Sequence, residues 1–367
     1  MHKEVRKGKL VLKDGSVYEG LLYGGKRNAV GEVCFTTGMS GYQETLTDPS
    51  FCGQIVVMTY PLVGNYGTNP MFNQGRKNFF QGYVIGELCD CPSNWRNEKS
   101  LEDWLEEQDL PTLVGVDTRA ITRKIRDHGV MPGVIVPADM PEAEVQALLD
   151  LPAIHDQVAT VTTPEVYTMG SGKYHIAVMD FGIKQNILNF LLCFDTRLTV
   201  FPASATAEEV MACNPNGIFL SNGPGDPKDL VDVIENVKKL IGRRPIFGIC
   251  LGHQLMALAN GADTYKMKFG HRGVNQPVKD LRSGRIYISS QNHGYAVDPA
   301  SIEGKGITVT HISMNDGTIE GVEYANHPTF TVQYHPEACP GPGGHEYLFK
   351  HFIDLMEGRY HAEAKYY

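Results

Sequence analysis

The hydrophobic pattern of the first 150 residues is that of short strands with a few helices between them. Residues 9–12 and 16–19 are short strand-like runs that flank Asp14-Gly15, a pair typical of hairpin turns. Residues 54–60 form an apolar run typical of a buried strand. Helices are predicted over 101–107, 119–127 and 141–150, the last with proline in its first turn. This pattern predicts a β-rich α+β domain.

Beyond residue 172 the pattern changes to an alternation of strands and helices. Strands are predicted over 175–180, 198–201, 218–220 and 246–249, and helices over 185–194, 229–241 and 251–260. Four more strands, without helices between them, are predicted over 285–288, 307–313, 319–324 and 329–334, and a last helix over 346–356. Strand–helix alternation is typical of a parallel sheet covered on both faces. The second half is therefore predicted to be α/β, with a mostly parallel mixed sheet flanked by helices.

The pattern is weakest between the two halves, where Gly170-Ser171-Gly172 is the best linker signal. We therefore predict a first domain over 1–152, a linker over 153–171 and a second domain over 172–367. A chain of 367 residues fits two domains of ordinary size. The 42% hydrophobic and 20% charged content is that of globular proteins, so each half can bury a core without metals or disulfides.

Charge and cysteine content narrow the class of protein further. The net charge of -9 argues against a protein that binds nucleic-acid backbone, which needs a basic surface. The sequence shows no signal peptide and no apolar run of about 18 residues, so no membrane span is expected. Eight scattered cysteines suit reduced thiols. A cytoplasmic protein is expected, with no nucleic-acid or membrane partner.

The strongest local motif covers residues 245–254, in which an apolar strand runs into a helix with Cys250 at the junction. Glycines stand two residues before and two residues after it, as in the turn that presents the nucleophile of α/β hydrolases. The glycines suit so tight a turn, and a helix N-terminus favours a thiolate. From this window alone, Cys250 is either a nucleophile or one more buried cysteine at a strand end.

A cysteine nucleophile needs a base, and the base needs a group that orients it. His335 follows the predicted strand 329–334, at a strand end where α/β sites form. Glu337 lies two residues on, where a carboxylate can hold the second ring nitrogen. Taken alone, His335 would be interpreted as part of an ordinary His-Pro turn. Together with Cys250, it is the preferred base. His253 has no carboxylate near it in sequence and is ranked as structural or substrate-side.

Two further segments have a composition typical of loops that line a binding site. Residues 221–227 contain glycines that let backbone N–H groups approach a ligand, and residues 291–295 offer an amide, a bare backbone and an aromatic ring. Alone, each is equally well explained as an ordinary turn or a polar hairpin end. No phosphate-loop or dinucleotide motif is present, and Cys89-x-Cys91 has no second pair at zinc spacing. Neither a nucleotide site nor a metal site is predicted.

Together these motifs resemble a known family. Residues 247–254 and His335-Pro336-Glu337 are similar to the class I, or triad, glutamine amidotransferases. Four segments of the first half are similar to the small-subunit family of carbamoyl-phosphate synthase: residues 37–44, 46–51, 59–67 and 115–123. The resemblance covers essentially the whole chain. It implies a small-subunit N-terminal domain followed by a class I glutamine amidotransferase domain.

The resemblance implies an activity and a partner. The chain would hydrolyse L-glutamine to glutamate and ammonia, as the glutaminase subunit of a heterodimer. The ammonia would pass through a tunnel to a large subunit, which would combine it with bicarbonate and two ATP. The product would be carbamoyl phosphate for arginine and pyrimidine biosynthesis. No cofactor is expected in this chain, and ATP and Mg are expected on the large subunit.

The resemblance also implies roles for residues. Cys250 would attack the glutamine amide and form a thioester, His335 would move the proton, and Glu337 would orient His335. Backbone N–H groups of Gly223 and Leu251 would form the oxyanion hole. The residues that would hold the glutamine are Ser50, Gly225, Gln254, Asn292, Gly294 and Tyr295. Several family members have Phe where this chain has Tyr295, so its hydroxyl needs a partner of its own.

Two other hypotheses remain at this stage. A stand-alone cysteine hydrolase of γ-glutamyl substrates would use the same kind of fold, but it would not need the motifs of the first half. A non-catalytic regulatory chain would not need an intact set of Cys250, His335 and Glu337.

Overall fold

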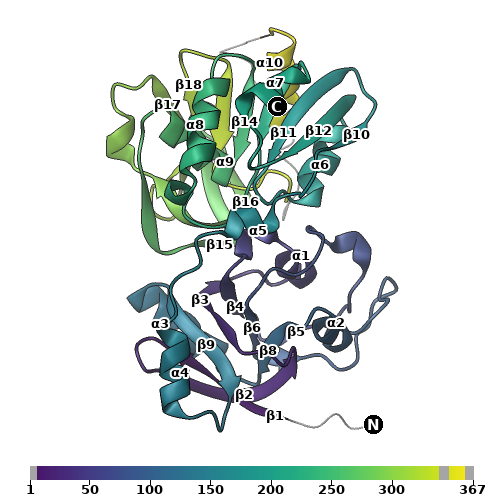
Figure 1. Cartoon of the computed structure of the whole chain (residues 1–367), viewed down its shortest axis with the longest axis vertical. Helices are drawn as coiled ribbons and strands as arrows, with labels where there is room; N and C mark the ends of the chain where they lie inside the picture. The colour runs from purple at the N-terminus through teal and green to yellow at the C-terminus, as the bar shows by residue number, and fades with distance from the viewer. Residues whose placement is uncertain (1–5, 339–346, 360–367) are drawn as a thin grey trace. The chain divides into compact units, whose positions relative to one another are not determined.

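The structure is a computed structural model that describes residues 6–338 and 347–359 (Figure 1). The chain separates into two compact units, with the division between His155 and Asp156. The range 153–171, predicted to be a linker, contains helix α5 (Gln157–Val161) and strand β10 (Tyr167–Gly170). The domain boundaries given above stay a prediction.

The first unit is built on a closed barrel of seven strands, in the order β1-β2-β8-β6-β4-β3-β9. The strands are β1 (Arg6–Leu12), β2 (Val17–Gly24), β3 (Ala29–Thr36), β4 (Gln54–Met58), β6 (Gly82–Ile85), β8 (Pro111–Val114) and β9 (Met131–Pro137). The predicted hairpin is confirmed, because β1 and β2 pair antiparallel and Asp14 Oδ1 accepts a 2.9 Å hydrogen bond from the Ser16 N–H. Strands β5 (Leu62–Val63) and β7 (Glu87–Leu88) form a separate pair.

Short helices surround this barrel. They are α1 (Tyr42–Leu46), α2 (Leu101–Glu107), α3 (Thr118–His128) and α4 (Glu142–Leu149), with the 3₁₀ turns η1 (Pro49–Phe51) and η2 (Pro70–Phe72). The three predicted helices are confirmed as α2, α3 and α4. Ser100 and Asp117 cap α2 and α3 by accepting hydrogen bonds from backbone N–H groups. Pro141 precedes α4 as its N-cap and does not lie in its first turn.

The second unit is built on a ten-stranded mixed sheet, in the order β10-β12-β11-β13-β14-β19-β18-β17-β15-β16. The five central strands from β12 to β19 run parallel. They are β11 (Tyr174–Asp180), β12 (Thr196–Pro202), β13 (Gly217–Leu220), β14 (Ile246–Ile249) and β19 (Thr329–Val332). The antiparallel extension is β18 (Ile319–Tyr324), β17 (Ile307–Ser313), β15 (Thr264–Asp280) and β16 (Ile286–Val297). The predicted mostly parallel mixed sheet is confirmed.

Helices cover both faces of this sheet and create two cores. They are α6 (Gln185–Leu192), α7 (Ala207–Ala212), α8 (Val231–Leu240), α9 (Leu251–Ala259) and α10 (Tyr347–Met356), with η3 (Pro227–Asp229) and η4 (Pro299–Ile302). Along β11, Ile176 and Val178 pack with α6 and α10, whereas Ala177 and Met179 pack with α7, α8 and α9. This alternation follows the two-residue period of a strand whose faces are both buried. The predicted helix start at residue 346 lies outside the described residues.

The prediction for the β15–β16 region is wrong. β15 was not predicted at all, and the strand predicted over 285–288 is only the start of the twelve-residue β16. Residues 291–295, interpreted above as a loop after a strand, lie inside β16. The pattern was missed because β16 buries polar side chains here, Gln291 and His293 among them, and so lacks the apolar alternation of an ordinary strand.

Candidate active site

Cys250 lies in the turn between β14 and α9, as the motif predicts. Its backbone has φ 54° and ψ −102°, and positive φ is uncommon for any residue with a side chain. The backbone N–H of Cys250 donates a 2.8 Å hydrogen bond to the carbonyl of Val332 on the neighbouring strand β19. The turn is thus strained and held in place by the sheet, which is the usual setting of a nucleophile presented at a strand end.

The two glycines around Cys250 are required by packing. A Cβ atom on Gly248 would lie 2.9 Å from both the Gly252 carbonyl oxygen and Cγ2 of Thr331. A Cβ on Gly252 would overlap the backbone of Leu220, and the Gly252 N–H donates to the Ser221 carbonyl at 3.0 Å. The strand-to-helix turn therefore depends on glycine at both positions, as the sequence pattern predicts.

His335 and Glu337 follow β19, which lies beside β14 in the sheet. His335 Nδ1 is 2.8 Å from Glu337 Oε1, and both side chains are buried. Lys184 Nζ lies 3.4 Å from the same carboxylate oxygen. Burial on its own raises the pKa of Glu337, but His335 and Lys184 outweigh it and hold that pKa at about 2. Glu337 is therefore an ionised acceptor that fixes the His335 ring.

The second ring nitrogen of His335 points into the protein. Nε2 is buried and has no hydrogen-bond partner among the described residues. The backbone N–H of His335 donates to the Ser290 carbonyl at 2.9 Å, which ties it to β16. On the same strand, the Asn292 carbonyl oxygen lies 3.6 Å from Cys250 Sγ. Strand β16 thus contacts both Cys250 and His335, although its residues are far from either in sequence.

Residues 221–226 form a loop after β13, as predicted, and Pro227 begins η3. A Cβ on Gly223 would overlap the Phe181 carbonyl, and Gly225 has φ +90°, so both positions need glycine. Leu251 begins α9, so its N–H belongs to the first turn, where helix N–H groups lack helical acceptors. These are the backbone groups expected to form an oxyanion hole.

The other predicted glutamine-binding residues of the second unit lie on α9 and β16. Gln254 is buried, and its Nε2 donates to the Tyr295 carbonyl at 2.8 Å and to Gln333 Oε1 at 3.0 Å. These bonds connect α9 to β16 and to the segment before His335. Asn292, Gly294 and Tyr295 themselves lie on β16. The structure therefore gathers these residues around the strand that contacts Cys250.

His253 and Ser50 complete the predicted set. His253 is fully buried, its Nδ1 is 2.8 Å from Thr331 Oγ1, and burial lowers its pKa to about 3. These contacts are those of a neutral structural histidine. Ser50 belongs to the first unit, where it lies in η1 and its N–H donates to Asp48 Oδ1 at 2.9 Å.

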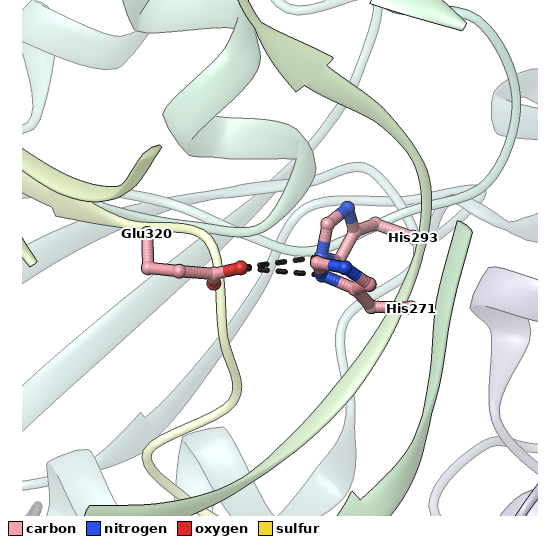
Figure 2. Close-up of side chains that lie close together, drawn as sticks. All are labelled: His271, His293 and Glu320. Atoms are coloured by element: carbon pink, nitrogen blue, oxygen red, sulfur yellow. Dashed lines mark ion pairs between the residues drawn. The ribbon is translucent and has the colours of Figure 1, made fainter. Parts of the chain in front are cut away.

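Sequence reasoning missed two features of the second unit. One is Lys184, beside Glu337. The other is a buried cluster of His271, His293 and Glu320, whose side chains converge in Figure 2. These three are the one set of His, Cys, Asp or Glu within the described ranges whose donor atoms lie within 4.8 Å of one another. Each nitrogen of His271 already faces a carboxylate oxygen, of Asp316 or of Glu320, so we interpret the contacts as ion pairs.

Comparison with known proteins places the chain in a family. The family model "Glutamine amidotransferase class-I" matches residues 177–355, so the second unit is a class I glutamine amidotransferase. The model "Carbamoyl-phosphate synthase small chain, CPSase domain" matches residues 10–135. The chain belongs to the carbamoyl-phosphate synthase small-chain family, and it is the glutamine-hydrolysing chain of that enzyme.

Curated relatives agree over nearly the whole length. The carbamoyl phosphate synthase small chain of Caldanaerobacter subterraneus subsp. tengcongensis is 51% identical, over 95% of this chain and 96% of that one. That of Bacillus cereus (strain ATCC 10987 / NRS 248) is 49% identical, over 96% of each chain. This match sets aside the stand-alone hydrolase and the non-catalytic chain. No helix among the described residues has the length and apolar character needed to cross a membrane.

Proposed function

We propose that Cys250, His335 and Glu337 form the catalytic triad for glutamine hydrolysis. The observation that carries the proposal is the strained Cys250 turn beside the buried His335–Glu337 pair, at the ends of two adjacent parallel strands. A nucleophile, a base and an orienting carboxylate are the three parts that covalent acyl transfer needs.

In the first half-reaction the thiol proton of Cys250 passes to His335 Nε2, and Sγ attacks the side-chain amide carbon of glutamine. Backbone N–H groups of Gly223 and Leu251 stabilise the oxyanion, a kind of contact worth about 2.7–4 kcal/mol. The carbon–nitrogen bond then breaks, His335 gives its proton to the leaving nitrogen, and ammonia departs. Glu337 stays ionised throughout and holds the imidazole.

In the second half-reaction water cleaves the thioester. His335 takes a proton from the water, the hydroxide attacks the acyl carbon, and the proton returns to Sγ as glutamate leaves. We assign the binding of glutamine to Ser50, Gly225, Gln254, Asn292, Gly294 and Tyr295, with the backbone of Gly223 and Leu251.

We further propose that the ammonia reaches a large subunit through a tunnel, in a cytoplasmic heterodimer. There it would join bicarbonate at the expense of ATP bound with Mg. The family match supports this division of labour, because a small chain implies a large one. The domain boundaries, 1–152 and 172–367 with a linker over 153–171, belong to the same proposal.

The test is Cys250→Ser in the complex with the large chain. Glutamine-dependent synthesis of carbamoyl phosphate should be lost, because a serine alcohol ionises far less readily than a thiol and is the weaker nucleophile at this position. Synthesis from added ammonia should remain, since it does not need the thiol. Cys193→Ser, an exposed cysteine at the end of α6, is the matched control and should behave as the unaltered chain. Substantial glutaminase activity in Cys250→Ser would reject the triad.

A further inference from the structure

The buried cluster around His271 lies beside the candidate active site and has no role in the mechanism above (Figure 2). His271 Nε2 is 2.9 Å from Asp316 Oδ2, and its Nδ1 is 3.3 Å from Glu320 Oε1. The contact of Nε2 with Asp316 is a hydrogen bond, whereas Nδ1 and Glu320 Oε1 lie within ion-pair distance without one, so the attraction to Glu320 is electrostatic. Burial alone lowers the pKa of His271, but Glu320 and Asp316 outweigh it and raise that pKa above its usual value. Burial also raises the pKa of Glu320 to about 7, although His271 lowers it, so each member of the pair favours the charged form of the other.

His271 connects to strand β16 through its neighbour His293. The two rings meet edge to face with centroids 5.0 Å apart, and the two residues are register partners across β15 and β16. His293 in turn is fixed by the Tyr295 carbonyl, 2.8 Å from Nδ1, and by Gln291 Oε1, 3.0 Å from Nε2. Burial and the charge of His271 keep the pKa of His293 low, so His293 is neutral. The cluster therefore holds the segment on which Asn292 approaches Cys250.

The backbone pairing of this segment is unusually short. β15 and β16 pair in register from His271 to Gly273, and the register shifts on both sides of those three residues. By themselves, three paired residues between two shifts of register do little to fix the position of Asn292. Side-chain contacts such as those of His271 must add to it.

Glu320 connects the cluster to the other side of the site. It lies on β18, and its carbonyl accepts a 2.9 Å hydrogen bond from the Gln333 N–H, two residues before His335. His271 lies on β15 and pairs with His293 of β16, so its ion pair with Glu320 joins the β15–β16 ladder to the segment that carries His335. Gln254 makes a second connection between the same two segments, through Tyr295 and Gln333.

We propose that His271 is a positioning residue, whose ion pairs with Glu320 and Asp316 fix the distance between the Cys250 side of the site and His335. The proposal rests on the triad assigned above. His271 does not touch the reacting atoms and acts through Asn292 on one side and through the β18–β19 pair on the other.

The test compares His271→Asn with the unaltered chain, both in complex with the large chain. Glutaminase kcat should fall roughly 10–150-fold, the range expected for loss of charge-assisted hydrogen bonds, with KM little changed. Alkylation of Cys250 by a chloroketone analogue of glutamine should slow by a similar factor. Ammonia-dependent synthesis should not change. A residue that served stability alone would lower the melting temperature and leave the kcat of the folded protein as it was.

Two further variants sharpen the test. Glu320→Gln keeps the size of the side chain and loses only its charge, so it should slow the same steps, and it decides the question if His271→Asn does not fold. His175→Asn is the matched control, because His175 is a buried histidine of the same sheet that is bonded to Thr199 and lies at the start of β11. It should leave kcat unchanged.

Four outcomes would overturn the proposal: unchanged kcat in both folded cluster variants, an equal loss in His175→Asn, a rise in KM alone, or a stoichiometric divalent metal whose removal abolishes activity. Failure of the analogue to label Cys250 in the unaltered chain would instead reject the triad. The two failures are therefore distinguishable.

Discussion

Lys184 Nζ lies 3.4 Å from Glu337 Oε1, the oxygen that also faces His335 Nδ1 at 2.8 Å. Lys184 immediately precedes α6, after β11, whereas Glu337 follows β19, and two strands separate β11 from β19 in the sheet. A buried carboxylate needs partners to stay ionised, and here it has an imidazole and an ammonium. Lys184 thus supports the orientation of His335 from a part of the chain about 150 residues away.

The first prediction concerns this ammonium. The pKa of Glu337 is lowered from 4.5 to about 2, so its ionised form stabilises the folded state above pH 4.5, and this stabilisation is lost as the pH falls from 4.5 towards 2. Lys184→Met removes one of the groups that lower this pKa. In plots of melting temperature and of glutaminase rate against pH, the acid limb, where both values fall, should therefore move to higher pH.

Thermal unfolding and glutaminase rates measured from about pH 2 to 7, a range that includes both pKa values above, would check this shift. Lys238→Met, which removes an exposed ammonium paired with Glu235 on α8, is the control and should leave both limbs in place. An acid limb that stays in place in a folded Lys184→Met chain would contradict the prediction.

The second prediction ranks the members of the triad. His335→Asn should lower glutaminase kcat by roughly 10⁴–10⁶-fold, nearly as much as loss of Cys250, because the members of a catalytic unit act together. Glu337→Gln should lower kcat by a factor about 100 times smaller, since loss of the orienting acid affects the rate least. Single-turnover measurement of thioester formation would check the order. His253→Asn is the control, and a large loss there beside an active His335→Asn would show that the base is wrongly assigned.

The third prediction tests whether Ser50 of the first unit takes part in glutamine binding. A serine hydroxyl that bonds a charged group of the substrate contributes about 1.5–3 kcal/mol. If it does so equally in the ground and transition states, Ser50→Ala should raise the glutamine KM roughly 10–150-fold and leave kcat nearly unchanged. Ammonia-dependent synthesis should be unaffected.

Steady-state glutaminase kinetics with a melting curve would check this prediction. Ser16→Ala, in the hairpin turn between β1 and β2, is the control, because it removes a serine hydroxyl of the same unit from a turn with no assigned function. An unchanged KM in folded Ser50→Ala would mean that the second unit alone builds the glutamine pocket.

The fourth prediction concerns the arginines of α3. Arg119, Arg123 and Arg126 share one face of this helix and line a cavity of about 870 Å³ in the first unit. Their spacing is that of a solvated or partner-facing surface, so Arg123→Ala should leave the glutaminase activity of the isolated chain unchanged. An activity assay with a folding control would check it, and a collapse of activity without unfolding would contradict it.

Much of the fold and the centre of the site could be predicted from the sequence because their causes are local. The Cys250 turn depends on two glycines within two residues of it, and the bounds of β14, β17 and β18 agree with their apolar runs. His335 could be proposed because a strand end and a nearby carboxylate are also local features. Ser50 and the glutamine contacts came only with the family resemblance.

What the sequence by itself determined is therefore the class of fold, the central strands and helices of the second unit and the residues that lie at strand ends. Only the tertiary structure decided which distant segments meet there. Strands β15 and β16 bury polar side chains, and their pairing is interrupted by shifts of register. For these reasons no regular alternation of apolar residues marks the two strands in the sequence. Lys184 and His271 matter through charges in a buried environment, and burial is a property of the packed sheet that no local run of residues reveals.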